Sequence, residues 1–574
     1  MTRADWRLVF LFWAVVALVF AIRTWLQYGG IPLVGGGDDA TRMVTATDLL
    51  NGQNWFDSIE HRDNTPFGAD MHWSRLIDTP IAALIATFKP FFGLAIAKDI
   101  AATTWPLLLF LPLLALEAAI ARAIMPAANL LPAVVLPVLA LAILDEFRPG
   151  RVDHHNMQLI LCLVSLLAFL AARTSWRGGV IAGLALATSL AIGLETVTFV
   201  AGAIAIMSLL WVYQPDRYRN AVIGFAASLF LGALGHFFIL IGPARYTELF
   251  CDVLGIPYLL VIGTSALAML IAALAASRIP SLLVRLVIIG GLGGAGAIGF
   301  ALLFPQCLAG PYGIVDPRII AAMYGDIAEA QGLGRAIMVD PSGAAAFALA
   351  ALAALPITAW IAWRSRGDTR ISWIIVLVFL AIADGTILFQ MRGAKFAAAY
   401  AIPSGVFLIN AARERYVTKR NLAGVGGLIG SWLLYAGAAQ ALIVGAPQSL
   451  LMPPRQAPTG LVAQSIVGSE CLKPPYLAKL AELPPGRVMA PIRIGPLILN
   501  LTPHSIVSSG FHRNNAGTLD VLAFYPGTDA ERRAILEKRG VDYVVSCGMS
   551  LSGEGLEPIS EPGDYLQIYK VALP

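Results

Sequence analysis

The sequence is poor in charged residues, and this shortage excludes most classes of soluble protein. Only 13% of the 574 residues are Asp, Glu, Lys or Arg, whereas a soluble domain carries about 25%. Hydrophobic residues make up 57% of the chain, and the mean hydropathy is +0.73. This composition predicts a polytopic membrane protein.

Several familiar motifs are also missing. The chain contains no G-x-S-x-G, H-E-x-x-H, Walker loop or C-x-x-C pair, which argues against serine hydrolases, zinc proteases and ATP-driven pumps. It has no basic stripe interleaved with aromatic residues, so nucleic acid is not an expected partner. Its five cysteines leave two interpretations open: Cys251–Cys307 and Cys471–Cys547 bridges in an oxidising compartment, or free buried thiols.

Hydrophobic runs recur along the first 450 residues. About 20 apolar residues suffice for a helix to cross the bilayer core. The apolar stretch 77–95 includes Lys89 and Pro90, and we predict that it forms a helix at the outer interface rather than a span. We predict thirteen spans, at residues 8–27, 99–121, 128–144, 156–173, 179–194, 196–213, 220–241, 256–277, 282–304, 343–363, 371–390, 394–412 and 422–445.

The placement of arginine predicts the orientation of these spans. If the N-terminus is cytoplasmic, every connection on that side carries arginine, as in "RSRGDTR" at 364–370. An odd number of spans then places the C-terminus outside, in the periplasm if the membrane is a bacterial inner membrane. Almost all Asp, Glu and His residues of the membrane half fall in the outer segments, chiefly 28–98, 145–155 and 305–342. This asymmetry predicts chemistry at the outer face.

The region 451–574 differs in composition from the preceding 450 residues. It alternates short β-like runs ("RVMAPI", "PLILNL", "SIVSS", "VDYVVSC") with turns and one helical stretch, "GTDAERRAILEKRG". Its length is sufficient for independent folding. We therefore predict a transmembrane domain at 1–450 and an extracytoplasmic α/β domain at 451–574.

Two acidic groups stand out in the outer segments. Asp38 and Asp39 follow a glycine run and precede Arg42, a pattern that suits a hard divalent cation. The island "RPGRVDHH" at 148–155 places Arg151 before the Asp153-His154-His155 run, which combines metal-ligand types with a phosphate-binding type. In both cases the alternative is the capped start of a helix without further function.

Three further segments carry candidate residues. Acids Asp316, Asp326 and Glu329 lie in 310–334, where we expect an amphipathic helix. Arg392 and Lys395 lie at the outer ends of two spans, where basic residues are disfavoured, so a bound anion is expected. In the C-terminal region, "FHRNN" at 511–515 is interpreted as a turn with an exposed basic tip formed by His512 and Arg513.

These motifs together resemble the GT-C glycosyltransferases, and most closely the oligosaccharyltransferase catalytic-subunit family. The resemblance covers the layout of nearly the whole chain, and the matching residues are Asp39 or Asp38 (first-loop acid), Asp153 and His155 (D-x-D positions), Glu329 (fifth-loop S/T-x-x-E) and Arg392 (arginine before an aromatic-rich helix). The chain departs from the family in having His155 at the second D-x-D position and in lacking a W-W-D-Y-G motif.

The resemblance implies an inverting glycosyltransferase that moves a sugar from a polyprenyl-(di)phosphate donor to an unknown acceptor at the outer face. It implies a divalent cation, Mn²⁺ or Mg²⁺, held by Asp39, Asp153, His155 and Glu329, with Asp38, Asp39 or Glu329 as the catalytic acids. Substrate contacts are expected from Arg392, Arg42, Arg151, His154, His512 and Arg513. The competing interpretations are a transporter or flippase for lipid-linked glycans and an assembly partner in the cell envelope.

Overall fold

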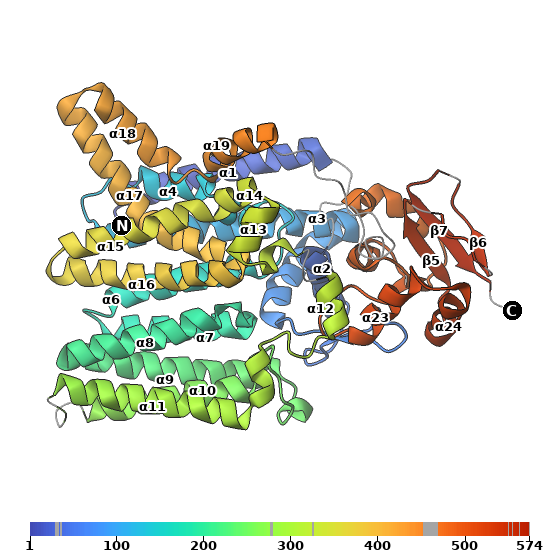
Figure 1. Cartoon of the computed structure of the whole chain (residues 1–574), viewed down its shortest axis with the longest axis horizontal. Coiled ribbons are helices and arrows are strands. Elements are labelled where there is room, and N and C mark those ends of the chain that lie inside the picture. The colour runs from blue at the N-terminus through green and yellow to red at the C-terminus, as the bar shows by residue number, and fades with distance from the viewer. Residues whose placement is uncertain are drawn as a thin grey trace.

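The structure is a computed structural model that describes residues 1–28, 34, 37–275, 279, 281–323, 327–451, 469–548, 550–553, 555–561 and 563–572. Long helices lie side by side along the longest axis, and a mixed helix–sheet domain sits at one end of the bundle (Figure 1). Asp326, one of the predicted acids, lies outside the described residues.

The first outer segment lies between α1 (Arg3–Tyr28) and the transmembrane half of α3 (Arg75–Ile124). It includes α2 (Gly37–Leu50) and a hairpin of β1 (Ile59–Glu60) and β2 (Ala69–Asp70). The helix α3 breaks at Gly93, whose φ of 77° is the left-handed conformation that glycine tolerates. The apolar stretch 77–95 is therefore a separate helical half of α3, and it ends at Gly93 rather than at Pro90.

The remaining helices of the bundle follow the predicted hydrophobic runs. The first group comprises α4 (Leu131–Leu139), α5 (Leu141–Leu144), η1 (Asp145–Phe147), α6 (His155–Ala171), α7 (Trp176–Ile192), η2 (Leu194–Thr196), α8 (Val197–Tyr213), α9 (Pro215–Leu240), α10 (Ile256–Leu274) and α11 (Leu282–Leu303). The second group comprises α12 (Pro317–Met323), η7 (Ala328–Ala330), α13 (Leu333–Val339), α14 (Pro341–Ala344), α15 (Ala350–Arg364), α16 (Gly367–Phe389), η9 (Met391–Gly393), α17 (Ala394–Lys419), α18 (Leu422–Leu433) and α19 (Gly437–Leu451).

Among the described residues, nine helices are long and apolar enough to cross a membrane, and a tenth span is possible if α18 and α19, bent by 96°, count as one. The other predicted spans coincide with shorter helices: α6 and α7 have 17 residues each, and α4 has 9. The polytopic helical fold class is thus confirmed. The expected amphipathic helix in 310–334 is instead divided between α12 and η7.

The C-terminal region forms a five-stranded sheet in the order β4-β3-β5-β7-β6. The strands are β3 (Arg487–Met489), β4 (Ser505–Ile506), β5 (Tyr543–Cys547), β6 (Leu556–Pro558) and β7 (Leu566–Val571), with β3 parallel to both β4 and β5. Helices α21 (Ala478–Ala481), α22 (Gly495–Leu501), α23 (Asn515–Phe524) and α24 (Asp529–Arg539) complete the domain. The β-like run "PLILNL" is wrong as a strand, because Pro496 starts a helix here and the apolar residues pack into a core on that helix.

The first outer segment extends this sheet. At the free edge of β4, the Ile506 amide donates to the Arg62 carbonyl at 2.7 Å, and the Thr65 amide donates to the Ile506 carbonyl at 2.9 Å. The apolar cores of the C-terminal domain also take in Val44 from α2 and a group from the 315–323 segment, namely Val315, Ile319 and Met323. The C-terminal domain therefore shares its cores with the outer segments of the transmembrane domain.

Both candidate disulfides are formed. Cys251–Cys307 joins the 242–255 segment to the segment after α11, and Cys471–Cys547 ties the start of the C-terminal domain to β5. Cys162 is a free, buried thiol within α6. The bridges hold two of the outer segments in place around the end of the bundle.

Candidate functional site

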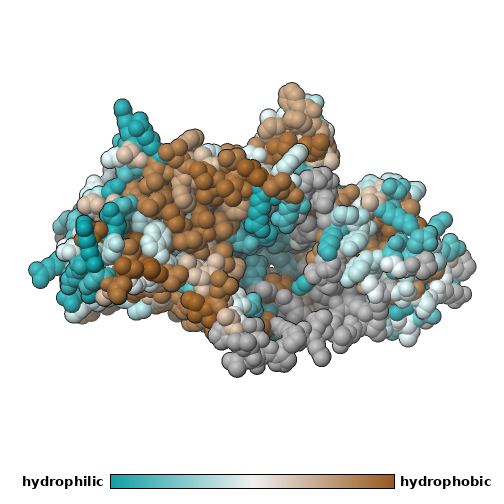
Figure 2. Space-filling view, turned by 90° about the horizontal axis from the view of Figure 1, so that it is seen from above, coloured by the Kyte–Doolittle hydropathy of each residue, from teal (hydrophilic) through white to brown (hydrophobic). Residues whose placement is uncertain are grey.

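The polar outer segments converge where the bundle meets the C-terminal domain. Figure 2 shows hydrophobic residues over the middle of the bundle and hydrophilic residues gathered beside a hollow between the bundle and the C-terminal domain. The start of α2, the 145–155 island, η2, η7 and η9 are joined there by the contacts described below. Residues more than a hundred positions apart thus come to share one site.

Asp39 attaches the first outer segment to the island. Its Oδ1 accepts hydrogen bonds from the backbone amides of Val152 (2.9 Å) and Asp153 (3.0 Å), and its Oδ2 lies 3.1 Å from Arg151 Nη1. These contacts occupy both carboxylate oxygens of Asp39. The two backbone hydrogen bonds hold the chain at Val152 and Asp153 in place.

A buried ion-pair chain continues from Arg151 into the bundle. Glu146 Oε2 lies 3.3 Å from Arg151 Nε, and Glu146 Oε1 lies 2.6 Å from Lys395 Nζ on α17. Burial alone would raise the pKa of Glu146, but Lys395 and Arg151 together lower it to about 2. Glu146 is therefore ionised, and Lys395 is committed to this pair.

Asp153, His154 and His155 form one buried group. Among the described residues, they are the set of three whose ligand atoms all lie within 4.8 Å of one another. Asp153 Oδ1 lies 2.6 Å from His154 Nδ1, and Oδ2, buried without a hydrogen bond, lies 3.3 Å from His155 Nε2. The unsatisfied oxygen is a ligand position of the kind that a cation would fill.

His154 connects this group to η2. Its Nε2 lies 3.4 Å from Glu195 Oε1, whose other oxygen accepts from Gln158 Nε2 at 3.3 Å. Burial disfavours a charged imidazole, but Asp153 and Glu195 raise the pKa of His154 to about 10. His154 is therefore a cation between two carboxylates at neutral pH.

Arg42 lies fully buried on the other side of Asp153. Its Nη1 donates to Asp78 Oδ1 at 2.8 Å, and its Nη2 lies 3.9 Å from Asp153 Oδ1. The guanidinium stacks over the Trp73 ring at 4.2 Å from the centroid. These contacts bind Arg42 into the protein and shape the wall of the site.

Arg392 faces the same site from η9. Its guanidinium lies 3.5 Å from Glu329 Oε1 and 3.9 Å from Glu195 Oε1, and its Nε is buried without a hydrogen-bond partner among the described residues. The predicted fifth-loop glutamate and the predicted arginine are therefore neighbours.

Asp38 differs from all of these acids. In the part of the chain that the structure describes, its carboxylate forms no hydrogen bond or ion pair. Burial, followed by the charges of Asp153 and Glu329, raises the pKa of Asp38 to about 7. Asp38 rather than Asp39 is thus the first-loop acid whose carboxylate is available.

The "FHRNN" prediction of an exposed tip is wrong. His512 is buried, and its Nε2 lies 2.7 Å from Asp252 Oδ2, while Arg513 Nε lies 2.6 Å from the same oxygen. Arg513 also pairs with Asp70 from β2. Burial is possible because the disulfide-linked 242–255 segment supplies the partner carboxylate, which no local pattern indicates.

The donor set fits a divalent cation. Asp153 Oδ2 and the available Asp38 carboxylate offer hard oxygen ligands, and His155 Nε2 offers nitrogen, which Mn²⁺ accepts. Around them, seven carboxylates face five permanent cations and the charged His154, so one carboxylate lacks a compensating charge. The carboxylates are Asp38, Asp39, Asp78, Glu146, Asp153, Glu195 and Glu329, and the cations are Arg42, Arg75, Arg151, Arg392 and Lys395.

Several members of this site were absent from the predicted set. Glu146, Asp78 and Trp73 lie in outer segments that the sequence singles out, and Glu195 lies between the predicted spans 179–194 and 196–213. Their position among polar outer residues was the available signal. Asp38, Asp39 and Glu329 lie outside the three-residue ligand group. The carboxylates of Asp39 and Glu329 contact Arg151 and Arg392 instead.

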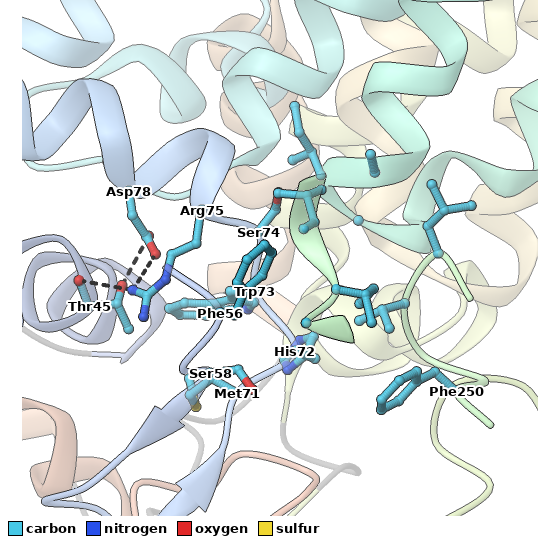
Figure 3. Close-up of a pocket in the computed structure, with 18 of the residues that line it drawn as sticks. Thr45, Phe56, Ser58, Met71, His72, Trp73, Ser74, Arg75, Asp78 and Phe250 are labelled. Atoms are coloured by element: carbon cyan, nitrogen blue, oxygen red, sulfur yellow. Dashed lines mark hydrogen bonds and ion pairs between the residues drawn. The ribbon is translucent and has the colours of Figure 1, made fainter. Parts of the chain in front are cut away.

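A pocket adjoins this site (Figure 3). Thr45 lies on α2 and Asp78 on α3, while Phe56, His72 and Trp73 come from the first outer segment and Phe250 from the 242–255 segment. Asp78, Arg75 and Trp73 connect the pocket wall to Arg42.

The fold is that of the GT-C glycosyltransferases, of the oligosaccharyltransferase type. The apo oligosaccharyltransferase of Archaeoglobus fulgidus is similar with a TM-score of 0.63 and 14% identity, over 94% of this chain and 69% of that one. The oligosaccharyltransferase AglB from Archaeoglobus fulgidus, in complex with an inhibitory peptide and a dolichol-phosphate, is similar with a TM-score of 0.61 and 13% identity, over 94% of this chain and 69% of that one.

A mycobacterial arabinofuranosyltransferase, AftD, is similar with a TM-score of 0.50 and 15% identity, over 100% of this chain and 42% of that one. No protein-family model matches the sequence, and no curated protein matches it. At these identities the likeness concerns the fold.

Proposed function

We propose that this chain is an integral-membrane glycosyltransferase that moves a sugar or oligosaccharide from a polyprenyl-(di)phosphate-linked donor to an acceptor at the outer face of the membrane. The observation that carries the proposal is the meeting of Asp38, Asp153 and Glu329 with Arg392 in one site of a GT-C fold.

The similar structures support the general kind of reaction. AglB is described with a dolichol-phosphate, and AftD is described as an arabinofuranosyltransferase. Both descriptions concern membrane glycosyltransferases, and the first concerns a lipid phosphate carrier. These two features of the neighbours agree with the roles that the polar site of this chain can perform.

The proposed chemistry follows from the charges at the site. Arg392 contacts Glu329, Glu195 and Tyr312, and its buried Nε has no hydrogen-bond partner among the described residues, so this nitrogen can donate to the donor phosphate. Glu329 lies beside Arg392, where it can orient an acceptor hydroxyl and accept its proton. Asp39 and Arg151 keep the Asp153 backbone fixed during the transfer.

Asp38, Asp153 and His155 would hold a divalent cation, Mn²⁺ or Mg²⁺, with Glu329 close to it. When bound, the cation would neutralise the charge that develops on the leaving phosphate. Displacement from the face opposite the phosphate would invert the anomeric centre. The metal and the inversion are both parts of the proposal.

We place the protein in a bacterial inner membrane with the N-terminus in the cytoplasm and the C-terminal domain in the periplasm. The arginine asymmetry and the two disulfides support this placement. A transporter would be expected to pair polar groups at mid-membrane. Glu117 and Asp384 instead have carboxylates without hydrogen-bond partners among the described residues, which favours chemistry at the outer face.

Binding of polyprenyl phosphate, the lipid product, tests the proposal. We expect the purified chain in lipid nanodiscs to bind undecaprenyl phosphate, and R392Q to weaken this binding by about 10- to 100-fold, the value of a charge-assisted contact. R364Q, at the opposite end of the bundle and partly stacked on Trp363, is the matched control. Equal affinity of R392Q and wild type would contradict the proposed donor site.

A further inference from the structure

The pocket beside the catalytic carboxylates has a composition that identifies its ligand. We propose that it binds a neutral saccharide unit of the acceptor, so that the reaction joins one sugar to another. This inference rests on the proposed glycosyl transfer and assigns the acceptor class, which that proposal leaves open.

Aromatic side chains from separate segments line the pocket. Trp55, Phe56 and Trp73 come from the first outer segment, and Phe250 comes from the 242–255 segment. Phe56 is 41% exposed, although it is a large hydrophobic residue. Figure 3 shows Phe56, Trp73 and Phe250 around the same space. Arg42 lies over the Trp73 ring, and Arg245 and Arg513 lie over the Phe250 ring. The exposed Phe56 and the partly exposed Trp55 therefore offer the apolar ring faces that suit the C–H faces of a sugar ring.

The three arginines of the pocket wall are already paired with carboxylates. Arg245 Nη2 lies 2.8 Å from Asp70 Oδ2, and Arg75 Nη1 lies 3.2 Å from Asp78 Oδ2. Arg513 is held by Asp252. An anionic ligand would therefore compete with existing ion pairs, whereas a neutral ligand would leave them intact.

Uncommitted hydrogen-bonding capacity remains in the same wall. His72 Nδ1 is buried and has no hydrogen-bond partner among the described residues. His72 lines the pocket beside His512, with the two ring centroids 4.3 Å apart. A sugar hydroxyl, which both donates and accepts, can satisfy this nitrogen in either tautomer.

Two residues that line the pocket also contact the residues of the catalytic site. Trp73 lines it and lies under Arg42, which contacts Asp153. Gly193 also lines it, and a Cβ at this position would clash with Glu195 and lie 3.2 Å from His154 Nε2. A bound sugar would therefore lie near Glu195 and be separated from Asp153 by Trp73 and Arg42.

The wall nearest the bundle is apolar apart from His236 of α9. Leu190 and Ile192 at the end of α7, and Leu240 and Ile241 at the end of α9, form this part. The saccharide can therefore come either from a soluble glycan or from a lipid-linked one. The shared chemistry is the neutral sugar, and the experiment separates the two sources.

The test uses the full chain in lipid nanodiscs, because glycoside detergents would compete for the pocket. Saturation-transfer NMR is recorded with methyl glycosides of glucose, galactose, mannose, arabinofuranose and N-acetylglucosamine, and with the corresponding octyl glycosides. We expect at least one glycoside to bind, and F56A to weaken that binding about 5- to 10-fold. F67A is the matched control, since Phe67 is 66% exposed in the same segment but lies against Arg539.

Equal binding of methyl and octyl forms would indicate a soluble glycan, and tighter binding of the octyl form a lipid-linked one; both results support the proposal. Absence of binding by every glycoside, or unchanged binding in F56A, would overturn it. An Asn-x-Thr peptide that binds wild type but not F56A would also overturn it. Undecaprenyl phosphate binding is measured on the same samples and fails only if the proposed donor site is wrong. A failure of the saccharide pocket can therefore be distinguished from a failure of the proposed function.

Discussion

Asp38 and Asp39 are adjacent in the sequence, yet their carboxylates have opposite surroundings. Asp39 accepts two backbone hydrogen bonds and an ion pair, whereas Asp38 has none of these among the described residues. Both acids lie in the first turn of α2, where a carboxylate is favoured by the helix dipole. The different partners, rather than the helix, separate a positioning acid from an available one.

We predict that D38N and D39N fail for different reasons. D38N removes an unpaired acid, so glycosyl transfer should fall at least about 100-fold while the melting temperature is retained or raised. D39N disrupts a partly buried network, so the free energy of unfolding should fall by about 3 kcal/mol along with activity. Thermal unfolding and donor turnover measured on the same samples check this. A strong loss of stability in D38N would contradict the assignment.

The raised pKa of Asp38 predicts a pH dependence of stability. Its folded-state pKa of about 7 exceeds the ordinary 3.8, so the folded state binds the proton more tightly than the unfolded state. The unfolding free energy of chelator-treated protein should therefore fall as pH rises from about 4 to 7. Thermal melts across this range measure the effect.

Asp63, with a pKa of about 6, and Glu60, with a pKa of about 8, change the stability with pH in the same direction. Both groups remain in D38N, so the difference in stability between D38N and wild type isolates the contribution of Asp38. The stability advantage of D38N over wild type should be near zero at pH 4 and largest above pH 7. Added Mn²⁺ should stabilise wild type more than D38N at pH 7.5. Parallel stability curves at all pH values would refute the role given to Asp38.

At the scale of residues, the sequence predicted which residue types form the site better than which residues contact one another. The Asp153-His154-His155 run was recognisable because its members are consecutive. The Glu146–Lys395 pair joins residues 249 positions apart, and the Asp252–Arg513 pair joins residues 261 apart. No local pattern reports such contacts, since they depend on how the helices pack.

At the scale of elements, the first outer segment is the part that connects the two domains. Its 62–65 stretch pairs with β4, and Asp63 accepts hydrogen bonds from the Ser509 amide (3.2 Å) and from Asn514 Nδ2 (3.1 Å). Arg62 donates to the Leu499 carbonyl at 2.8 Å. The hydrophobic pattern predicted the long helices, but it could not predict this sheet extension, because the segment is polar and irregular.

We predict that D63A loosens this connection. The carboxylate is fully buried, so its removal leaves several buried donors without acceptors and should lower the unfolding free energy by about 3 kcal/mol. Hydrogen exchange at the Ile506 amide should accelerate. D57A, in the same segment and paired with the exposed His61, should cost less than about 1 kcal/mol. Equal effects of the two variants would contradict the proposed connection.

At the scale of the whole molecule, composition and the hydrophobic runs were sufficient to predict a polytopic helical membrane protein. Long apolar helices and a separate C-terminal sheet follow from periodicity and length. The boundary at residue 450 is less informative, because Val44 and the 315–323 segment contribute to the C-terminal cores. A core shared by distant segments arises from how those segments pack in three dimensions. A domain boundary placed in the sequence cannot predict it.

The orientation provides a prediction at this scale. Alkaline phosphatase fused to the C-terminus should be active in cells, because the C-terminal domain and its Cys471–Cys547 bridge are proposed to be periplasmic. Green fluorescent protein fused after Arg366 should be fluorescent, because that connection is proposed to be cytoplasmic. The reverse pattern would refute the proposed topology.

The central claim is that the buried acidic site performs glycosyl transfer. The most direct measurement is the transfer rate of purified wild type, D153N and D145N in nanodiscs with polyprenyl-phosphate-linked sugar donors, Mn²⁺ and glycoside acceptors. Asp145 belongs to the same island but forms an exposed pair with Arg148. We expect D145N to retain wild-type activity and D153N to lose at least about 100-fold. Full transfer activity in D153N would contradict it.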